Sequence, residues 1–206
     1  MTDDEDVAAL IAAAETDQVA VIERLLAGGC AIDGRDAQGR TALLAATHRD
    51  GVAAARVLIA GGADVNAKDA IQDSPYLYAA AEGHLEILRL TLRAGADLTS
   101  TNRYGGTGLI PAAHHGHRDI VAALLATEID VDHVNRPGWT ALIEAVILGD
   151  GGPVYQAIVR LLLDAGAGAG IADADGVTPL SHARQRGFTE IVALLEAADA
   201  RLTASP

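Results

Sequence analysis

The sequence of 206 residues has little of several features that other protein classes need. A single cysteine, Cys30, excludes an internal disulfide and fits a reducing compartment. The 15 Lys and Arg are outnumbered by 28 Asp and Glu, and they form no basic patch, so a chain of net charge −13 is expected to repel nucleic acids. No apolar run approaches the roughly 18 residues of a membrane-spanning helix, which excludes a membrane protein of that kind.

Aromatic residues are also scarce, at 3%, although half of the chain is apolar. The apolar residues are therefore mostly small and aliphatic, which is typical of closely packed helices. The first residues are acidic where a secretory signal would be basic, so we expect a cytoplasmic protein. The Ala-rich composition suggests a bacterial source. No phosphate-binding loop, CxxC, HExxH or GxSxG motif is present, so we expect no enzyme and no cofactor.

A block of residues recurs along the chain. A hydroxyl residue occurs every 33 residues at Thr41, Ser74, Thr107 and Thr140, and again at Thr178 after a further 38 residues. Each hydroxyl is followed five positions later by Ala, and then by an aliphatic pair or its equivalent, as in Leu124-Leu125. Self-similarity at one fixed period is the sequence signature of a repeat protein.

Each block has the period of two helices. Ile120, Val121, Leu124 and Leu125 form one apolar stripe, and an earlier apolar segment, 109–115, ends at Gly116. Glycine can adopt the left-handed conformation that ends a helix. The blocks therefore predict an all-α fold of stacked helix-turn-helix units, joined by polar turns.

These blocks resemble the ankyrin repeat. The resemblance is carried by Gly62-Ala63-Asp64-Val65-Asn66-Ala67, by Ala79 to Ile87 with its Glu-Gly-His, and by Asp173 to Leu180 with its Asp-Gly-Val-Thr-Pro-Leu. The resemblance implies an ankyrin-repeat solenoid with projecting loops or short β-hairpins. We expect a single domain over 1–206, with an N-terminal capping unit (1–35), internal repeats at 36–68, 69–101, 102–134 and 135–172, and a C-terminal capping repeat (173–206).

Three departures from the family pattern are visible. The histidine that pins the turn in Thr-Pro-Leu-His is absent from every unit, which predicts turns weakened by about 0.5–1.5 kcal/mol for each missing hydrogen bond. Five extra residues, placed at 150–154, are expected between the two helices of their unit. Glu128-Ile129 replaces the usual Gly-Ala, so that helix should end differently. Cys30 occupies a small-residue position and is expected to be buried.

The resemblance also implies where a partner binds, because ankyrin partners usually contact a concave groove of hairpin tips and first helices. Trp, Tyr and Arg are the residues most enriched among binding hot spots. We expect a protein partner with an acidic or mixed-charge surface, and a monomeric chain. The predicted partner-binding residues are Arg40, His48, Arg49, Arg103, Tyr104, His114, His115, Arg136, Trp139 and Leu148.

Two further functions stay open at this point. A stoichiometric inhibitor, or an immunity-type protein of an enzyme or toxin, would use the same groove. A metal-dependent regulator or enzyme would use the cluster from His114 to Asp119, although Gly116 separates its members and we expect no metal. Ser181-His182 is not expected to form a catalytic pair, because neighbours on a helix point about 100° apart.

Overall fold

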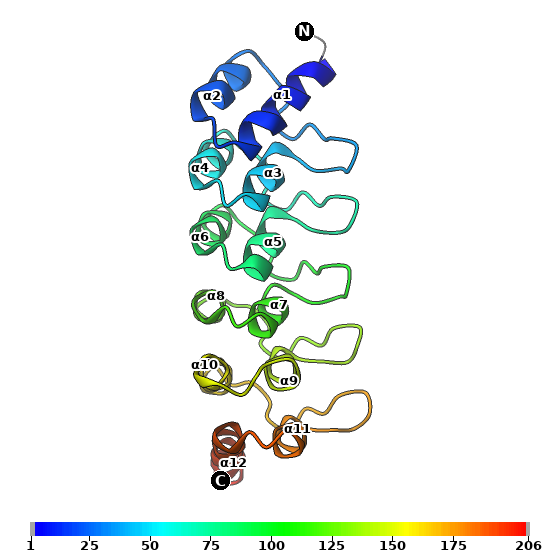
Figure 1. Ribbon diagram of the computed structural model, residues 1–206, viewed down its shortest axis with the longest axis vertical. Helices are drawn as coiled ribbons and strands as arrows, with labels where there is room; N and C mark the ends of the chain where they lie inside the picture. Colours follow the sequence, from blue (N-terminus) through cyan, green and yellow to red (C-terminus); the bar gives the residue numbers. More distant parts are fainter. Residues whose placement is uncertain (1–2, 205–206) are drawn as a thin grey trace. The chain divides into compact units, whose positions relative to one another are not determined.

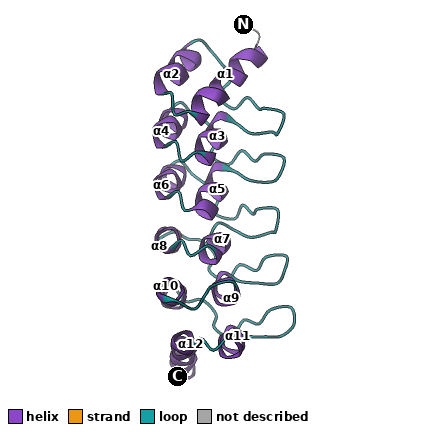
Figure 2. Cartoon of the chain, in the orientation of Figure 1, coloured by secondary structure: helices purple, strands orange, loops and turns teal. Residues whose placement is uncertain are grey.

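The computed structural model describes residues 3–204, and the side chains of residues 4–200. The fold is all-α, and the loops between helix pairs contain no strand within 3–204 (Figures 1 and 2). The helices are α1 (Asp3–Glu15), α2 (Val19–Ala27), α3 (Ala42–His48), α4 (Val52–Ala60), α5 (Pro75–Glu82), α6 (Leu85–Arg93), α7 (Leu109–His114), α8 (Arg118–Leu125), α9 (Ala141–Ile147), α10 (Pro153–Asp164), α11 (Pro179–Gln185) and α12 (Thr189–Ala204). None of them is long and apolar enough to cross a membrane within the described part of the chain.

The recurring hydroxyl residues begin the first helix of most repeats. Thr41, Ser74, Thr140 and Thr178 each accept a hydrogen bond from the backbone N–H three residues later. This bond satisfies one of the N–H groups that a helix leaves unpaired at its start. Thr107 differs, because the helical Gly108 takes the capping position of α7, and the buried Thr107 hydroxyl has no hydrogen-bond partner.

A carboxylate or amide at the base of the projecting loops replaces the missing turn histidine. Asp36 and Asp69 each accept two backbone N–H bonds from their own loops through Oδ1. Asp173 does the same for its loop and also lies 2.7 Å from His182 Nε2. Side-chain-to-backbone bonds of this kind hold turns closed, and the weakening of the turns by the missing histidine stays a prediction.

The chain divides into two compact units, Met1–Arg103 and Tyr104–Pro206. In unit 1 the first helices α1, α3 and α5 pack in one row and the second helices α2, α4 and α6 in another. The core between the rows is aliphatic, with Leu43, Leu58 and Leu88 fully buried. Neighbouring loops are joined where the Ala70 N–H donates to the Gln38 carbonyl at 3.0 Å.

Unit 2 repeats this arrangement with α7, α9 and α11 in one row and α8, α10 and α12 in the other. The five extra residues do not all lie between the helices, which corrects the sequence prediction. Pro153 and Val154 begin α10, which has 12 residues where α8 has 8. Proline is favoured in the first turn of a helix, where its missing N–H would be unpaired anyway, so the insertion lengthens α10 as well as the turn.

Two smaller expectations have opposite outcomes. Cys30 is half-buried rather than buried, because it lies in the turn that follows α2. The end of α8 does differ from its neighbours, as predicted. Thr127 Oγ1 accepts a bond from the Ile129 N–H at 3.3 Å. The corresponding turn after α6 uses Gly95 in a left-handed conformation, with a φ of 89°.

Candidate protein-interaction surface

The tips of two neighbouring loops in unit 2 carry three of the predicted residues. Tyr104 is 56% exposed, and its carbonyl accepts a 2.9 Å hydrogen bond from the Arg136 N–H of the next loop. Gly105, with a φ of 77°, makes this approach possible, since a Cβ there would lie 2.9 Å from Arg136 Cγ. Trp139 is half-buried, and its backbone N–H donates to Asn135 Oδ1 at 2.9 Å. Trp139 is therefore less exposed than a binding residue at a loop tip would be.

The first helices of unit 2 bring three more predicted residues to the chain's surface. His114, at the end of α7, has 40% of its side chain exposed, and its ring centroid lies 4.5 Å from that of the exposed His115. The His114 carbonyl accepts a 2.8 Å bond from the Tyr155 hydroxyl, which fixes the end of α7 against α10. Leu148 follows α9 and is 40% exposed. Tyr104, His114, His115, Arg136, Trp139 and Leu148 are called the loop face of unit 2 below.

Sequence reasoning missed a buried acid beside this face. Glu144 lies on α9, is 6% exposed, and its Oε1 accepts a 2.8 Å bond from Asn135 Nδ2. Its Oε2 lies 3.6 Å from His114 Nδ1 on α7. Burial raises the pKa of Glu144 to about 7, although the Asn135 bond opposes this shift. Burial, and then the charge of His115, lower the pKa of His114.

A signal for Glu144 was present in the sequence. Four positions after the hydroxyl, the other repeats carry Ala45, Tyr78, Pro111 and His182, so Glu144 is the acid at a position that faces the neighbouring first helices. Its own loop base is an amide, Asn135, where three other repeats have an Asp. An amide can donate to a carboxylate, whereas a second carboxylate cannot.

In unit 1, ion pairs hold Arg40 in place. Its guanidinium lies 3.0 Å from Glu15 Oε1 and 2.8 Å from Asp36 Oδ2, and the Arg40 side chain is only 24% exposed. Burial lowers the pKa of Arg40, but the bond to Asp36 and the charges of both acids outweigh it and raise that pKa. The charge of Arg40 is therefore largely balanced within unit 1.

The other predicted residues of unit 1 differ in their surroundings. The His48 ring packs 4.1 Å from that of Tyr78, its Nε2 is buried without a hydrogen-bond partner, and burial lowers its pKa. Arg49 is exposed. Arg103 is exposed and lies 3.7 Å from Asp73 Oδ2. These residues and the loop face belong to different units, so each group is described by itself.

The arrangement gives no support to the metal-dependent alternative. Asp119 pairs with Arg118 at 2.8 Å rather than with a histidine. Among the side chains of residues 4–200, no group of three or more His, Cys, Asp or Glu is placed to hold a metal ion. Ser181 and His182 bond separately, to Thr178 and Asp173, and do not form a nucleophile-base pair.

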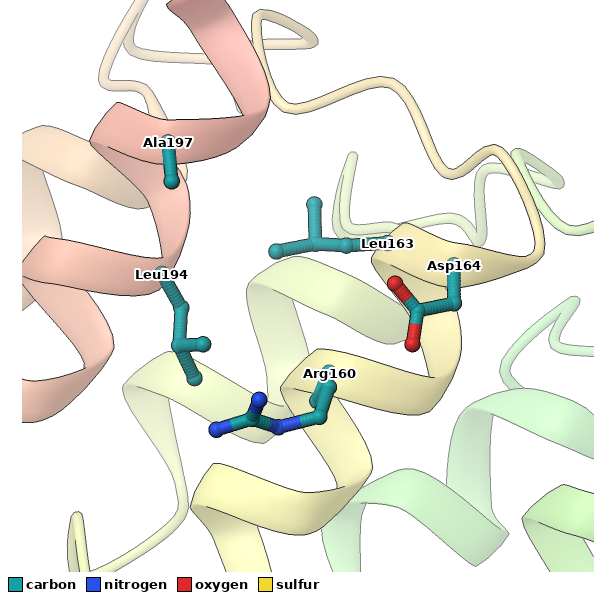
Figure 3. Close-up of a pocket in the computed structure, with 5 residues that line it drawn as sticks. All are labelled: Arg160, Leu163, Asp164, Leu194 and Ala197. Atoms are coloured by element: carbon teal, nitrogen blue, oxygen red, sulfur yellow. The ribbon is translucent and has the colours of Figure 1, made fainter. Parts of the chain in front are cut away.

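An open pocket lies between the second helices α10 and α12 of unit 2. Arg160, Leu163 and Asp164 line it from α10, and Leu194 and Ala197 line it from α12 (Figure 3). Sequence analysis did not predict it. Its lining has two solvent-exposed charged residues of opposite sign and no pair of titratable groups suited to catalysis.

Comparisons with known proteins agree with the repeat pattern. A family model described as "Ankyrin repeats (3 copies)" matches residues 1–69 and 76–173. A segment of 57 residues is 56% identical to YahD of Escherichia coli (strain K12), which is 28% of this chain and 28% of YahD. The chain resembles the crystal structure of an ankyrin repeat domain from Acinetobacter baumannii AYE, with 57% identity, a TM-score of 0.91, and coverage of 92% of this chain and 97% of that one. It also resembles the ankyrin repeat domain of Bcl-3, described as a member of the IkappaB protein family, with 26% identity, a TM-score of 0.83 and coverage of 92% and 85%.

Proposed function

The chain belongs to the ankyrin repeat family, whose repeats are generally protein-protein interaction modules without enzymatic activity, and from this premise we propose that it is an adaptor that binds one protein partner. The partner contacts the concave groove of loop tips and first helices, and the loop face of unit 2 is the centre of the contact. We further propose that the chain is a cytoplasmic, monomeric protein of a bacterium.

The exposure of Tyr104 is the observation that carries this proposal. A side chain that is 56% exposed at a loop tip contributes little to the core, and Tyr is among the residues that dominate binding when a partner covers them. Leu148, also exposed, adds apolar area on the same face, while Arg136 adds a cation. This mixture of exposed apolar, aromatic and basic residues matches the composition of known binding surfaces.

The charges on the face favour a partner with an acidic or mixed-charge surface. Arg136, His114 and His115 supply positive or protonatable groups to a chain of net charge −13. In unit 1, Arg40 is balanced by Glu15 and Asp36, and Arg103 lies 3.7 Å from Asp73 Oδ2. Contacts between exposed charges weaken with salt, so we expect weaker binding at higher ionic strength.

A capture experiment tests the proposal. The tagged chain retains a stoichiometric protein from a lysate of the source organism, and Tyr104→Ala weakens that binding by about 30-fold, equivalent to about 2 kcal/mol. Val154→Ala is the matched control, because Val154 is 49% exposed but lies on the second helix α10. Equal losses for both variants, or full binding by Tyr104→Ala and Leu148→Ala together, would place the contact elsewhere.

A further inference from the structure

Glu144 and His114 form an acid-base pair that links two repeats of unit 2. Glu144 Oε1 is occupied by the Asn135 amide at 2.8 Å, so Oε2 is the oxygen that faces His114 Nδ1 at 3.6 Å. The Glu144 side chain is 8% exposed, whereas the His114 side chain is 40% exposed. The lone pairs of the two imidazole nitrogens point in different directions, so Nε2 is the ring nitrogen left for a contact with another group.

The number of protons on this pair determines whether His114 Nε2 is a hydrogen-bond donor or acceptor. When the pair carries one dissociable proton, on Glu144 Oε2 or on His114 Nδ1, the imidazole keeps its other proton on Nε2, which is then a hydrogen-bond donor. When the dissociable proton leaves, the carboxylate 3.6 Å away favours the neutral imidazole with its remaining proton on Nδ1. Nε2 is then a bare acceptor, because a neutral imidazole with a proton on one ring nitrogen has none on the other.

We propose that Glu144 positions His114 as a proton-dependent donor on the loop face of unit 2, and that the His114 Nε2–H binds a carboxylate of the protein partner. This inference rests on the proposed function and names the chemistry of one contact within it. A carboxylate is the acceptor that binds this N–H most strongly, because a hydrogen bond with a charged member is about twice as strong as a neutral one. The same contact is lost when Nε2 becomes an acceptor, since two acceptors repel.

The titratable groups around the pair in unit 2 fit this assignment. The His115 ring packs against that of His114, with the two centroids 4.5 Å apart. Tyr155, from α10, donates to the His114 carbonyl and not to its ring. On α11 and its loop, His182 is bound to Asp173, and Arg186 donates to the Ile147 and Gly149 carbonyls. These groups are occupied, which leaves Glu144 as the acid that faces the His114 ring.

Histidine side-chain NMR on the isolated chain tests the role of Glu144. Long-range proton-nitrogen spectra between pH 5 and 9 distinguish Nδ1–H from Nε2–H for a neutral imidazole. Above pH 8, where Glu144 is ionised, we expect neutral His114 to carry Nδ1–H in the native chain and Nε2–H in Glu144→Gln, whose amide can donate to Nδ1. Glu128→Gln makes the same charge change at an exposed position and should behave like the native chain. Above pH 8, neutral His114 with Nε2–H in the native chain would overturn the assignment, and so would an identical titration in Glu144→Gln.

The carboxylate contact is tested on the same sample with the peptide Ac-Gly-Asp-Gly-NH2. We expect the His114 ring signals to shift on titration at pH 6 and to need about tenfold more peptide at pH 9, which is the effect of losing one charged hydrogen bond. The peptide Ac-Gly-Asn-Gly-NH2 is the neutral control. Equal responses to both peptides, or no response at pH 6, would refute the carboxylate. Neither of these two NMR measurements needs the protein partner. If Tyr104→Ala does not weaken capture, the proposed binding surface is refuted, but the NMR results on His114 are unaffected.

Discussion

The buried carboxyl of Glu144 should make the stability of the protein depend on pH with a known sign. Burial raises the pKa of Glu144 from 4.5 to about 7, so the folded chain holds a proton there that the unfolded chain has lost. Between these two values the folded state binds more protons, and the free energy of unfolding therefore falls as pH rises. At about 1.4 kcal/mol for each pKa unit, the shift corresponds to about 3 kcal/mol of stability that is present below pH 4.5 and lost above pH 7.

Glu144→Gln removes this dependence, because glutamine keeps an oxygen for the Asn135 bond and does not ionise. Urea unfolding followed by circular dichroism at 222 nm should show the variant gaining up to about 3 kcal/mol on the native chain between pH 4.5 and pH 8. Burial lowers the pKa of His114 and gives a slope of opposite sign, which the histidine NMR titration of each chain measures separately. Glu128→Gln should follow the native chain at every pH. A constant difference between Glu144→Gln and the native chain would refute the reasoning.

Two pairs of matched substitutions give further predictions. Thr140→Val should lower the free energy of unfolding by about 1 kcal/mol, because it removes the helix cap of α9. Thr107→Val should raise the free energy of unfolding by about 1 kcal/mol, because it removes a buried hydroxyl without a partner. Urea unfolding at pH 7 measures both, and a change of the same sign in both variants contradicts the proposed difference between the two caps. Gly151→Ala should destabilise by about 2 kcal/mol or more, since its φ is 74° and a Cβ would lie 2.4 Å from the Phe188 ring. Gly176→Ala has a φ of 76° but open space around it, so a loss of about 1 kcal/mol is expected; equal thermal melting temperatures would show that the ring contact does not matter.

The helices and the family could be predicted from the sequence because their determinants are local and repeated. Thr41 and Ser74 mark helix starts through bonds that span only three residues, and the same pattern recurs in other repeats. A hydrogen bond at a fixed spacing can be predicted without knowing the rest of the fold. The missing turn histidine was also visible. Its substitute was not, because Asp36 and Asp69 read as ordinary loop residues until their bonds to the loop N–H groups are known.

Side-chain environments at the surface were harder to predict, because they depend on residues that are distant in sequence. Arg40 looked like a binding residue, yet Glu15, from the preceding repeat, pairs with it. Position within a repeat predicts the row to which a residue belongs, but it does not predict the partner that the neighbouring repeat supplies. Trp139, which was predicted to bind a partner from its place at a loop tip, is half-buried.

Glu144 explains why the sequence and the structure suggest different roles for His114. In sequence, His114 belongs to a histidine cluster that suggests metal binding, with Asp119 as its nearest acid. In space, Asp119 pairs with Arg118, and the acid that faces His114 comes from the next repeat, 30 residues later in the chain. A histidine beside one buried carboxyl is suited to holding and releasing a proton, whereas a metal needs several ligands that converge. The neighbouring repeat thus supplies the acid that faces His114. Although its sequence context suggests metal coordination, the chemistry that we propose for His114 is to hold and release a proton at a surface that other proteins can contact.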